Sequence, residues 1–209
     1  MKLLFLYTLS SHFLSDDDGN GYIDDVNGWD FANSDNTVFD SASEDKHGTH
    51  TAGIIAAGAN NGGIKGVAPG IKVMPLKFIT STGGYTSDAI EAIEYARTMG
   101  IKIINCSFGG SQENYALRDA MASSGILFVC SAGNKGQDTA VYPVYPASLS
   151  LPNIISVATI NSSGELAGFS NYGADVDIAA PASTYLAQCP ETTMKCRAVH
   201  PCLQHLLQE

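Results

Sequence analysis

Hydrophobic positions along the chain follow two periods, and together they predict an ordered series of strands and helices. Short apolar runs of strand length occupy residues 72–78, 101–106, 126–130, 153–160 and 176–180. Between them, residues 85–100 and 115–124 place apolar side chains at helical spacing. Strands that alternate with helices in this way predict an α/β fold, a three-layer doubly wound sandwich around a mostly parallel sheet. The continuous apolar strands predict a sheet that is covered on both faces.

One further predicted helix carries the first candidate catalytic residue. An acidic, turn-rich region ends just before His47, and an apolar run follows. This pattern predicts a helix over residues 47–59 that begins at His47. A histidine in the first turn of a buried helix is held rigidly, which suits a general base. His50 is interpreted as a packed helix residue. The alternative, a zinc site formed by His47 and His50, is disfavoured because two zinc-binding histidines on a helix are usually four residues apart with a glutamate between them.

Length and charge exclude several classes of partner. The 209 residues suffice for one domain with a substantial core. A net charge of -10 leaves no basic patch for phosphates, so no nucleic-acid partner is expected. No apolar stretch approaches the length of a transmembrane span, so no membrane partner is expected either. We expect a monomer.

The cysteines and the amino terminus carry less information. The five cysteines form no recognisable disulfide framework. Cys106 and Cys130 lie in apolar runs and are interpreted as small buried residues, whereas the other three crowd the tail. Residues 1–15 contain Lys2 and a short apolar run without a clear cleavage site, the features of a weak signal peptide, and they stay unassigned.

Residues 16–27 have the composition of a calcium loop. Oxygen-bearing side chains fall at alternate positions, and Gly21 then permits a sharp turn. A hard cation takes six to eight oxygens from such a curled backbone, although the flanking helices and final glutamate of an EF-hand are missing. The alternative is an Asp/Gly turn without an ion. The predicted calcium ligands are Asp16, Asp18, Asn20, the carbonyl of Tyr22 and Asp25, with Asp24 or Asn27 as alternatives to Asp25. No organic cofactor is expected.

Two polar, glycine-rich motifs follow predicted strands, at residues 105–110 and 131–136. Sites in doubly wound sheets lie at the carboxyl ends of strands, so these motifs are expected at one functional edge. Together with residues 47–53 and 66–69, and in the same order, they resemble the motifs of the subtilisin-like serine peptidases. The resemblance covers residues 16–181. It implies a partial peptidase domain, proteolysis through an acyl-enzyme and an extended polypeptide as substrate.

The resemblance also implies roles for single residues. His47 is similar to the general base of that family, and His50 to its second, non-catalytic histidine. Asn134 is similar to the oxyanion donor, for which the asparagine of subtilisin is itself the reference case. The implied substrate-binding positions are the backbone edge at Ser107, Phe108 and Gly109 and the pocket floor at Ala132 and Gly133.

Two motifs of the family are missing from this sequence. Residues 1–15 contain no acidic side chain, so the aspartate that orients the imidazole is absent. The string Gly-Thr-Ser-Met-Ala, which carries the nucleophile, does not occur after Pro181, where the composition changes abruptly. We therefore expect a subtilisin-like fold truncated at both ends, an aberrant tail over residues 182–209, and little or no proteolysis.

The genetic code offers an explanation for the tail. Residues 181–206, back-translated with degenerate codons and read one base out of register, are compatible with a continuation that includes Gly-Thr-Ser-Met. Met194 before Lys195 forces a glutamate in that frame, whereas other positions are free. We expect a frameshift just after Pro181. A nucleotide sequence that cannot spell the serine motif in the shifted frame would exclude it.

Two other functions stay open at this point. The chain could be a catalytically dead module that binds peptide or calcium, or an unstable pseudogene product. Secretion is usual in the family, and the sequence leaves the location of this chain undetermined.

Overall fold

The computed structural model describes residues 16, 18–58 and 65–181 in full. It also describes the backbone of four short strands, β1 (Lys2–Phe5), β10 (Tyr185–Leu186), β11 (Arg197–Ala198) and β12 (Leu207–Gln208). The helices of the described part are α1 (Ala42–Ala56), α2 (Thr86–Thr98) and α3 (Tyr115–Ser123). Its other strands are β2 (Trp29–Asp30), β3 (Met74–Lys77), β4 (Ile79–Thr80), β5 (Gly83–Tyr85), β6 (Ile103–Cys106), β7 (Leu127–Ser131), β8 (Ile154–Ile160) and β9 (Ile178–Pro181).

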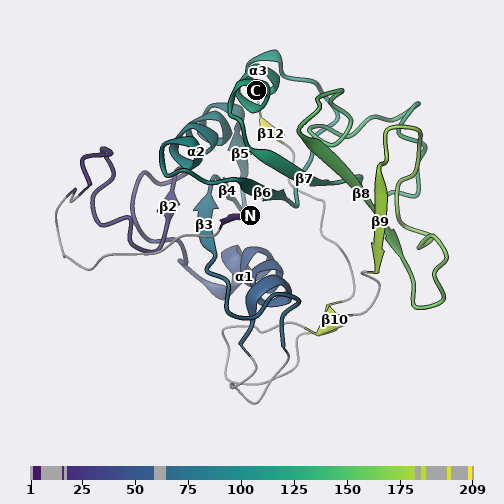
Figure 1. Cartoon of the computed structure of the whole chain (residues 1–209), viewed down its shortest axis with the longest axis horizontal. Helices are drawn as coiled ribbons and strands as arrows, with labels where there is room; N and C mark the ends of the chain where they lie inside the picture. Colours follow the sequence, from purple (N-terminus) through teal and green to yellow (C-terminus); the bar gives the residue numbers. More distant parts are fainter. Residues whose placement is uncertain are drawn as a thin grey trace.

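The strands form a mostly parallel arrangement between two helical layers. β6, β7, β8 and β9 pair in this order, and all three pairings are parallel. β3 pairs with β2 in parallel and with β1 antiparallel. Helices α2 and α3 lie on one side of the strands and α1 lies on the other (Figure 1). The predicted α/β class, doubly wound with a mostly parallel sheet, is therefore confirmed.

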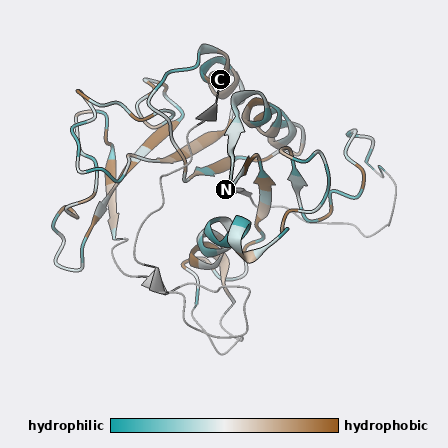
Figure 2. Cartoon of the chain, turned by 180° about the vertical axis from the view of Figure 1, so that it is seen from behind, coloured by the Kyte–Doolittle hydropathy of each residue, from teal (hydrophilic) through white to brown (hydrophobic). Residues whose placement is uncertain are grey.

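One face of the parallel strands forms the main core. Ile104, Cys106, Phe128 and Cys130 are at most 2% exposed and belong to one buried cluster with residues of α2 and α3. On the other face, Ile103 is 48% exposed and its register partner Leu127 is only half-buried. Seen from behind, the sheet strands carry much of the hydrophobic colour (Figure 2). The sequence predicted a sheet covered on both faces, but among the described residues only one face of the sheet is fully covered.

Helix α1 begins five residues before the predicted start, and that part of the prediction was wrong. Ser41 adopts an extended conformation and its hydroxyl accepts a hydrogen bond from the backbone N–H of Glu44 at 3.2 Å. Ser-x-x-Glu is the sequence of a capping box, and acidic residues favour a first turn. His47 consequently lies in the second turn of α1.

The remaining predicted elements are present with bounds that shift by a few residues. The strand β2 and the β4–β5 hairpin were not predicted, because two- and three-residue strands leave no periodic pattern. Cys106 and Cys130 are buried, as predicted, and burial raises the pKa of the Cys106 thiol. None of the helices in the described part of the chain combines the length and the apolar character of a membrane span.

Candidate functional site

The predicted base and the predicted cleft edge meet in the structure. His47 projects from α1, and its Nε2 lies 3.3 Å from the carbonyl oxygen of Ser107. Ser107 follows the last residue of β6, so the contact forms at the carboxyl end of a parallel strand. The hydroxyl of Ser107 accepts a hydrogen bond from the Asn105 amide at 2.8 Å.

This contact favours a form of His47 with a proton on Nε2. A carbonyl oxygen only accepts hydrogen bonds, so Nε2 must donate. A general base in a serine peptidase needs the opposite arrangement, with the lone pair of Nε2 directed at the nucleophile. While Nε2 donates to Ser107, its lone pair is not available to a nucleophile.

The second predicted motif lies at the same sheet edge. Cys106 and Cys130 are register partners in β6 and β7, so the residues that follow each of them emerge side by side. Ala132 is fully buried and its N–H donates to the carbonyl of Val157 at 3.0 Å. Asn134 is half-buried beyond this anchored turn. Phe108, by contrast, packs its ring against Phe78, with 5.0 Å between the ring centroids.

A buried asparagine that the sequence analysis did not identify holds this turn in place. Asn171 is fully buried, and its Oδ1 accepts from the backbone N–H groups of Lys135 at 2.9 Å and Gln137 at 3.1 Å. Its Nδ2 donates to the carbonyl of Ala132 at 3.1 Å. Gly133 has a φ of +117°, and a Cβ there would lie 2.3 Å from that Nδ2. Asn171 thus fixes the backbone on both sides of Asn134.

The predicted calcium ligands curl around a single amide. The Nδ2 of Asn20 donates to Asp18 at 3.1 Å and to Asp25 at 2.8 Å. Both carboxylate oxygens of Asp16 accept backbone N–H groups of the same loop. In the described part of the chain, no three acidic, histidine or cysteine side chains are arranged to hold a metal ion. The loop therefore gathers carboxylate oxygens, and the amide nitrogen of Asn20 lies between two of the carboxylates.

An aromatic cluster joins this loop to α2. The ring of Tyr22 stands edge-on to Trp29, Phe31 and Tyr95, with centroids 4.7 to 5.8 Å away. The Tyr95 hydroxyl donates to Asp25 at 2.5 Å, and the Tyr22 hydroxyl donates to Glu91 at 3.0 Å. Burial, the Glu91 hydrogen bond and nearby carboxylates raise the pKa of Tyr22 to about 12. Burial and Asp25 raise the pKa of Tyr95 as well.

Stability is expected to fall as the pH rises from about 10 to about 12. The unfolded chain loses the Tyr22 proton near pH 10, whereas the folded chain holds it to about 12, so the folded state binds more protons in this window. Urea unfolding across these pH values measures the slope. Tyr22→Phe is expected to reduce it and leave the contribution of Tyr95, whereas Tyr115→Phe, at an exposed tyrosine, is expected to leave it unchanged. Equal slopes in both variants would contradict the assignment.

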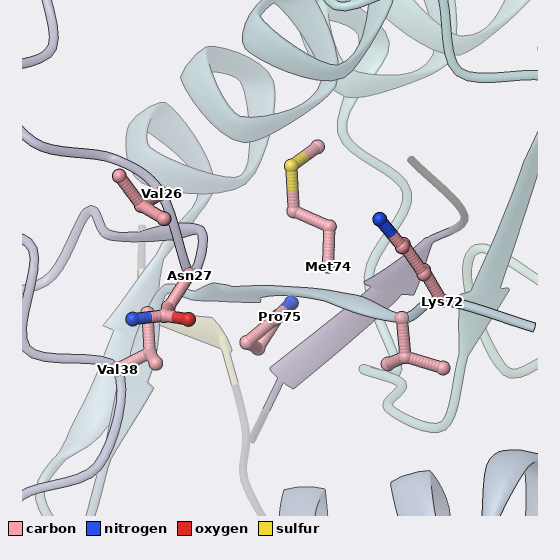
Figure 3. A pocket seen from close by; sticks show the side chains of 7 residues that line it. Val26, Asn27, Val38, Lys72, Met74 and Pro75 are labelled. Atoms are coloured by element: carbon pink, nitrogen blue, oxygen red, sulfur yellow. The ribbon is translucent and has the colours of Figure 1, made fainter. Parts of the chain in front are cut away.

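A separate pocket of about 460 Å³ lies beside β2 and β3 (Figure 3). Its lining is mostly apolar, with Asn27 and Lys72 as the polar members beside Val26, Val38, Val73, Met74 and Pro75. None of the predicted site residues lines it. The pocket is therefore distinct from the edge that carries His47 and Ser107.

Comparisons with known proteins agree with the fold and give the class of protein, the subtilisin-like serine peptidases. The family model of the subtilases, Peptidase S8, matches residues 7–205. Thermitase of Thermoactinomyces vulgaris is 36% identical over 173 residues, 80% of this chain and 59% of thermitase. Subtilisin NAT of Bacillus subtilis subsp. natto is 40% identical over 152 residues, 70% of this chain and 39% of that protein.

Solved structures give the same result. A cold-adapted subtilisin-like serine proteinase matches with a TM-score of 0.59 and 30% identity, over 75% of this chain and 55% of that one. A protease from Pseudoalteromonas arctica matches with a TM-score of 0.59 and 34% identity, over 68% of this chain and 44% of that one. This chain belongs to the subtilase family, a family of serine endopeptidases. It spans 59% and 39% of the two curated relatives named above.

Proposed function

We propose that the chain carries the base and oxyanion half of a serine endopeptidase site, and that it holds extended polypeptide without cleaving it at an enzymatic rate. The observation that carries the proposal is the contact between His47 Nε2 and the Ser107 carbonyl, which brings the base to the cleft edge. Exposed backbone at such an edge can pair with an added peptide strand. The sequence offers no serine motif for a covalent step.

Turnover is expected to be about 10⁶-fold below that of an intact subtilisin, the loss known for that enzyme when its nucleophile is removed. The residual rate would come from binding and oxyanion stabilisation alone. A fluorogenic peptide and a serine-directed phosphonate probe measure this, with a subtilisin as the positive control. Specific phosphonate labelling of this chain would overturn the proposal.

Binding without turnover separates this function from the rival of an unstable product. Fluorescence anisotropy with a labelled extended peptide is expected to show saturable binding to a chain that melts cooperatively. A chain that melts without a transition supports the unstable product, because part of the sheet face is uncovered in the described residues. A folded chain that neither binds nor cleaves peptide would contradict the proposed function.

We also propose that the loop of residues 16–27 binds calcium. Asp18 and Asp25 converge on one amide nitrogen, and their oxygens are the ligands that calcium prefers. An ion would take the place of that nitrogen, and Asn20 would then present its amide oxygen to the ion, with Asp16 and the Tyr22 carbonyl as the other ligands. The ion would supply structural cross-linking of the loop and no part of the chemistry.

Calcium is expected to raise the melting temperature, because a ligand at 100 times its Kd stabilises a folded state by about 2.7 kcal/mol. Thermal melts in calcium, magnesium and EDTA measure this effect. Asp18→Asn is expected to abolish the response, whereas Asp119→Asn, on the exposed side of α3, is expected to retain it. Equal melting temperatures in calcium and EDTA would contradict the site. We also propose that the protein is secreted, as is usual in the family.

A further inference from the structure

A buried lysine lies next to the first turn of the helix that carries His47. Lys77 is the last residue of β3 and is fully buried, and its neighbours Leu76, Phe78 and Ile79 are buried and apolar. Lysine is almost never fully buried unless its charge is paired. None of the roles assigned so far uses this residue.

Three carboxylates from three segments surround the ammonium group of Lys77. Asp30 of β2 lies 2.9 Å from Nζ and Asp45 of α1 lies 3.6 Å away, and Asp40 of the intervening segment accepts a hydrogen bond. Asp30 and Asp45 are fully buried. Burial lowers the pKa of Lys77, but the hydrogen bonds to Asp40 and Asp30 and the charges of Asp30 and Asp45 raise it above its usual value, so the lysine stays charged.

The link from this cluster to the candidate site runs through Asp45. Its Oδ1 faces Lys77, and its Oδ2 accepts from the backbone N–H of Asp40 at 2.7 Å and of Ser41 at 3.3 Å. Asp45 thus ties the entry into α1 to the buried end of β3. His47 lies two residues further along the same helix.

We propose that Lys77 is a positioning residue for His47. Through its ion pair with Asp45 it fixes the first turns of α1, and so it holds the imidazole at the carboxyl end of β6. The inference rests on the proposed function only for the role of His47. The contact it explains exists in the resting chain, without substrate.

The hydrogen-exchange lifetime of the His47 Nε2 proton reports this positioning, since that proton is hydrogen-bonded to Ser107. It is measured by NMR on chain with ¹⁵N-labelled histidine at a pH near 8, above the usual histidine pKa of about 6.5. Asp45→Asn is expected to shorten the lifetime by about tenfold, because it weakens a buried charged contact. Lys77 keeps Asp30 and Asp40 as partners in this variant.

The matched control is Asp40→Asn, which removes the same unit of charge from the same lysine but lies outside α1. It is expected to leave the lifetime unchanged. Equal effects of the two variants would show that charge alone matters and would overturn the proposal, as would a wild-type chain without a protected Nε2 proton. If Asp45→Asn does not melt cooperatively, Asp45→Glu replaces it, and an effect no larger than that of Asp40→Asn again overturns the proposal.

The outcome is independent of catalysis. A chain that binds and cleaves no peptide can still show the difference between Asp45→Asn and Asp40→Asn. A chain that cleaves peptide but shows no difference would refute the positioning role alone.

Discussion

Replacing Asn171 with leucine is expected to destabilise the fold by about 1–3 kcal/mol and to release the turn that carries Asn134, because the carbonyl of the buried Ala132 loses its partner and an unpaired buried polar group costs about that much. The substitution keeps nearly the same volume, so packing changes little. It removes the partners of two backbone N–H groups, at Lys135 and Gln137, and of the Ala132 carbonyl. Urea unfolding gives the free energy, and amide hydrogen exchange at Lys135 and Gln137 reports the turn itself.

Asn153→Leu is the matched control for this prediction. The Asn153 amide also bridges backbone, since its Nδ2 donates to the carbonyls of Met121 at 2.9 Å and Ile126 at 2.8 Å. It lies at the amino end of β8, away from the candidate site. It is expected to lower stability without faster exchange at Lys135 and Gln137. Faster exchange in both variants would mean that the turn responds to global unfolding and that Asn171 has no local role.

Asn171 differs from the predicted site residues in what the sequence could reveal. His47, Ser107 and Asn134 could be singled out from the sequence because each belongs to a local motif that resembles one of the family. The motifs of Ser107 and Asn134 also follow predicted strands, whose carboxyl ends share one edge. Asn171 lies more than 30 residues from the backbone groups that it bridges. No periodicity or spacing connects residues that far apart, so only the folded chain shows the connection.

Helix α1 makes the same point about boundaries. The apolar run that begins near His47 predicted the helix, but the capping box at Ser41 and Glu44 sets its start. Those residues are polar and lie in an acidic stretch, so the sequence pattern predicted a loop there. The early start also brings Asp45 into the helix, which is why its connection to Lys77 was not visible in the sequence.

Lys77 did leave a signal, since it is a charged residue inside an apolar strand. Such a residue predicts either an exposed strand edge or a buried ion pair, and the sequence alone does not decide between them. The decision depends on Asp30, its register partner in β2, and β2 is too short to be predicted.

Replacing Lys77 with methionine is expected to destabilise the fold by about 3–5 kcal/mol, because removing one partner of a buried ion pair leaves uncompensated charge. Methionine fills similar volume, so the loss measures the charge and not a cavity. Asp30 and Asp45 are fully buried and would have to take up protons or pull water into the core. Lys72→Met, at an exposed lysine near the start of the same strand, is expected to change stability by less than about 0.5 kcal/mol.

The triple variant Lys77→Met, Asp30→Asn, Asp45→Asn separates charge from packing. Without buried charges the penalty for desolvation disappears, so this variant is expected to recover much of the stability that Lys77→Met loses. Urea unfolding of the three variants beside the wild-type chain measures the differences. If the triple variant is less stable than Lys77→Met, the three residues matter as hydrogen-bonding shapes and not as charges, and the ion pair would no longer explain how α1 is attached to β3.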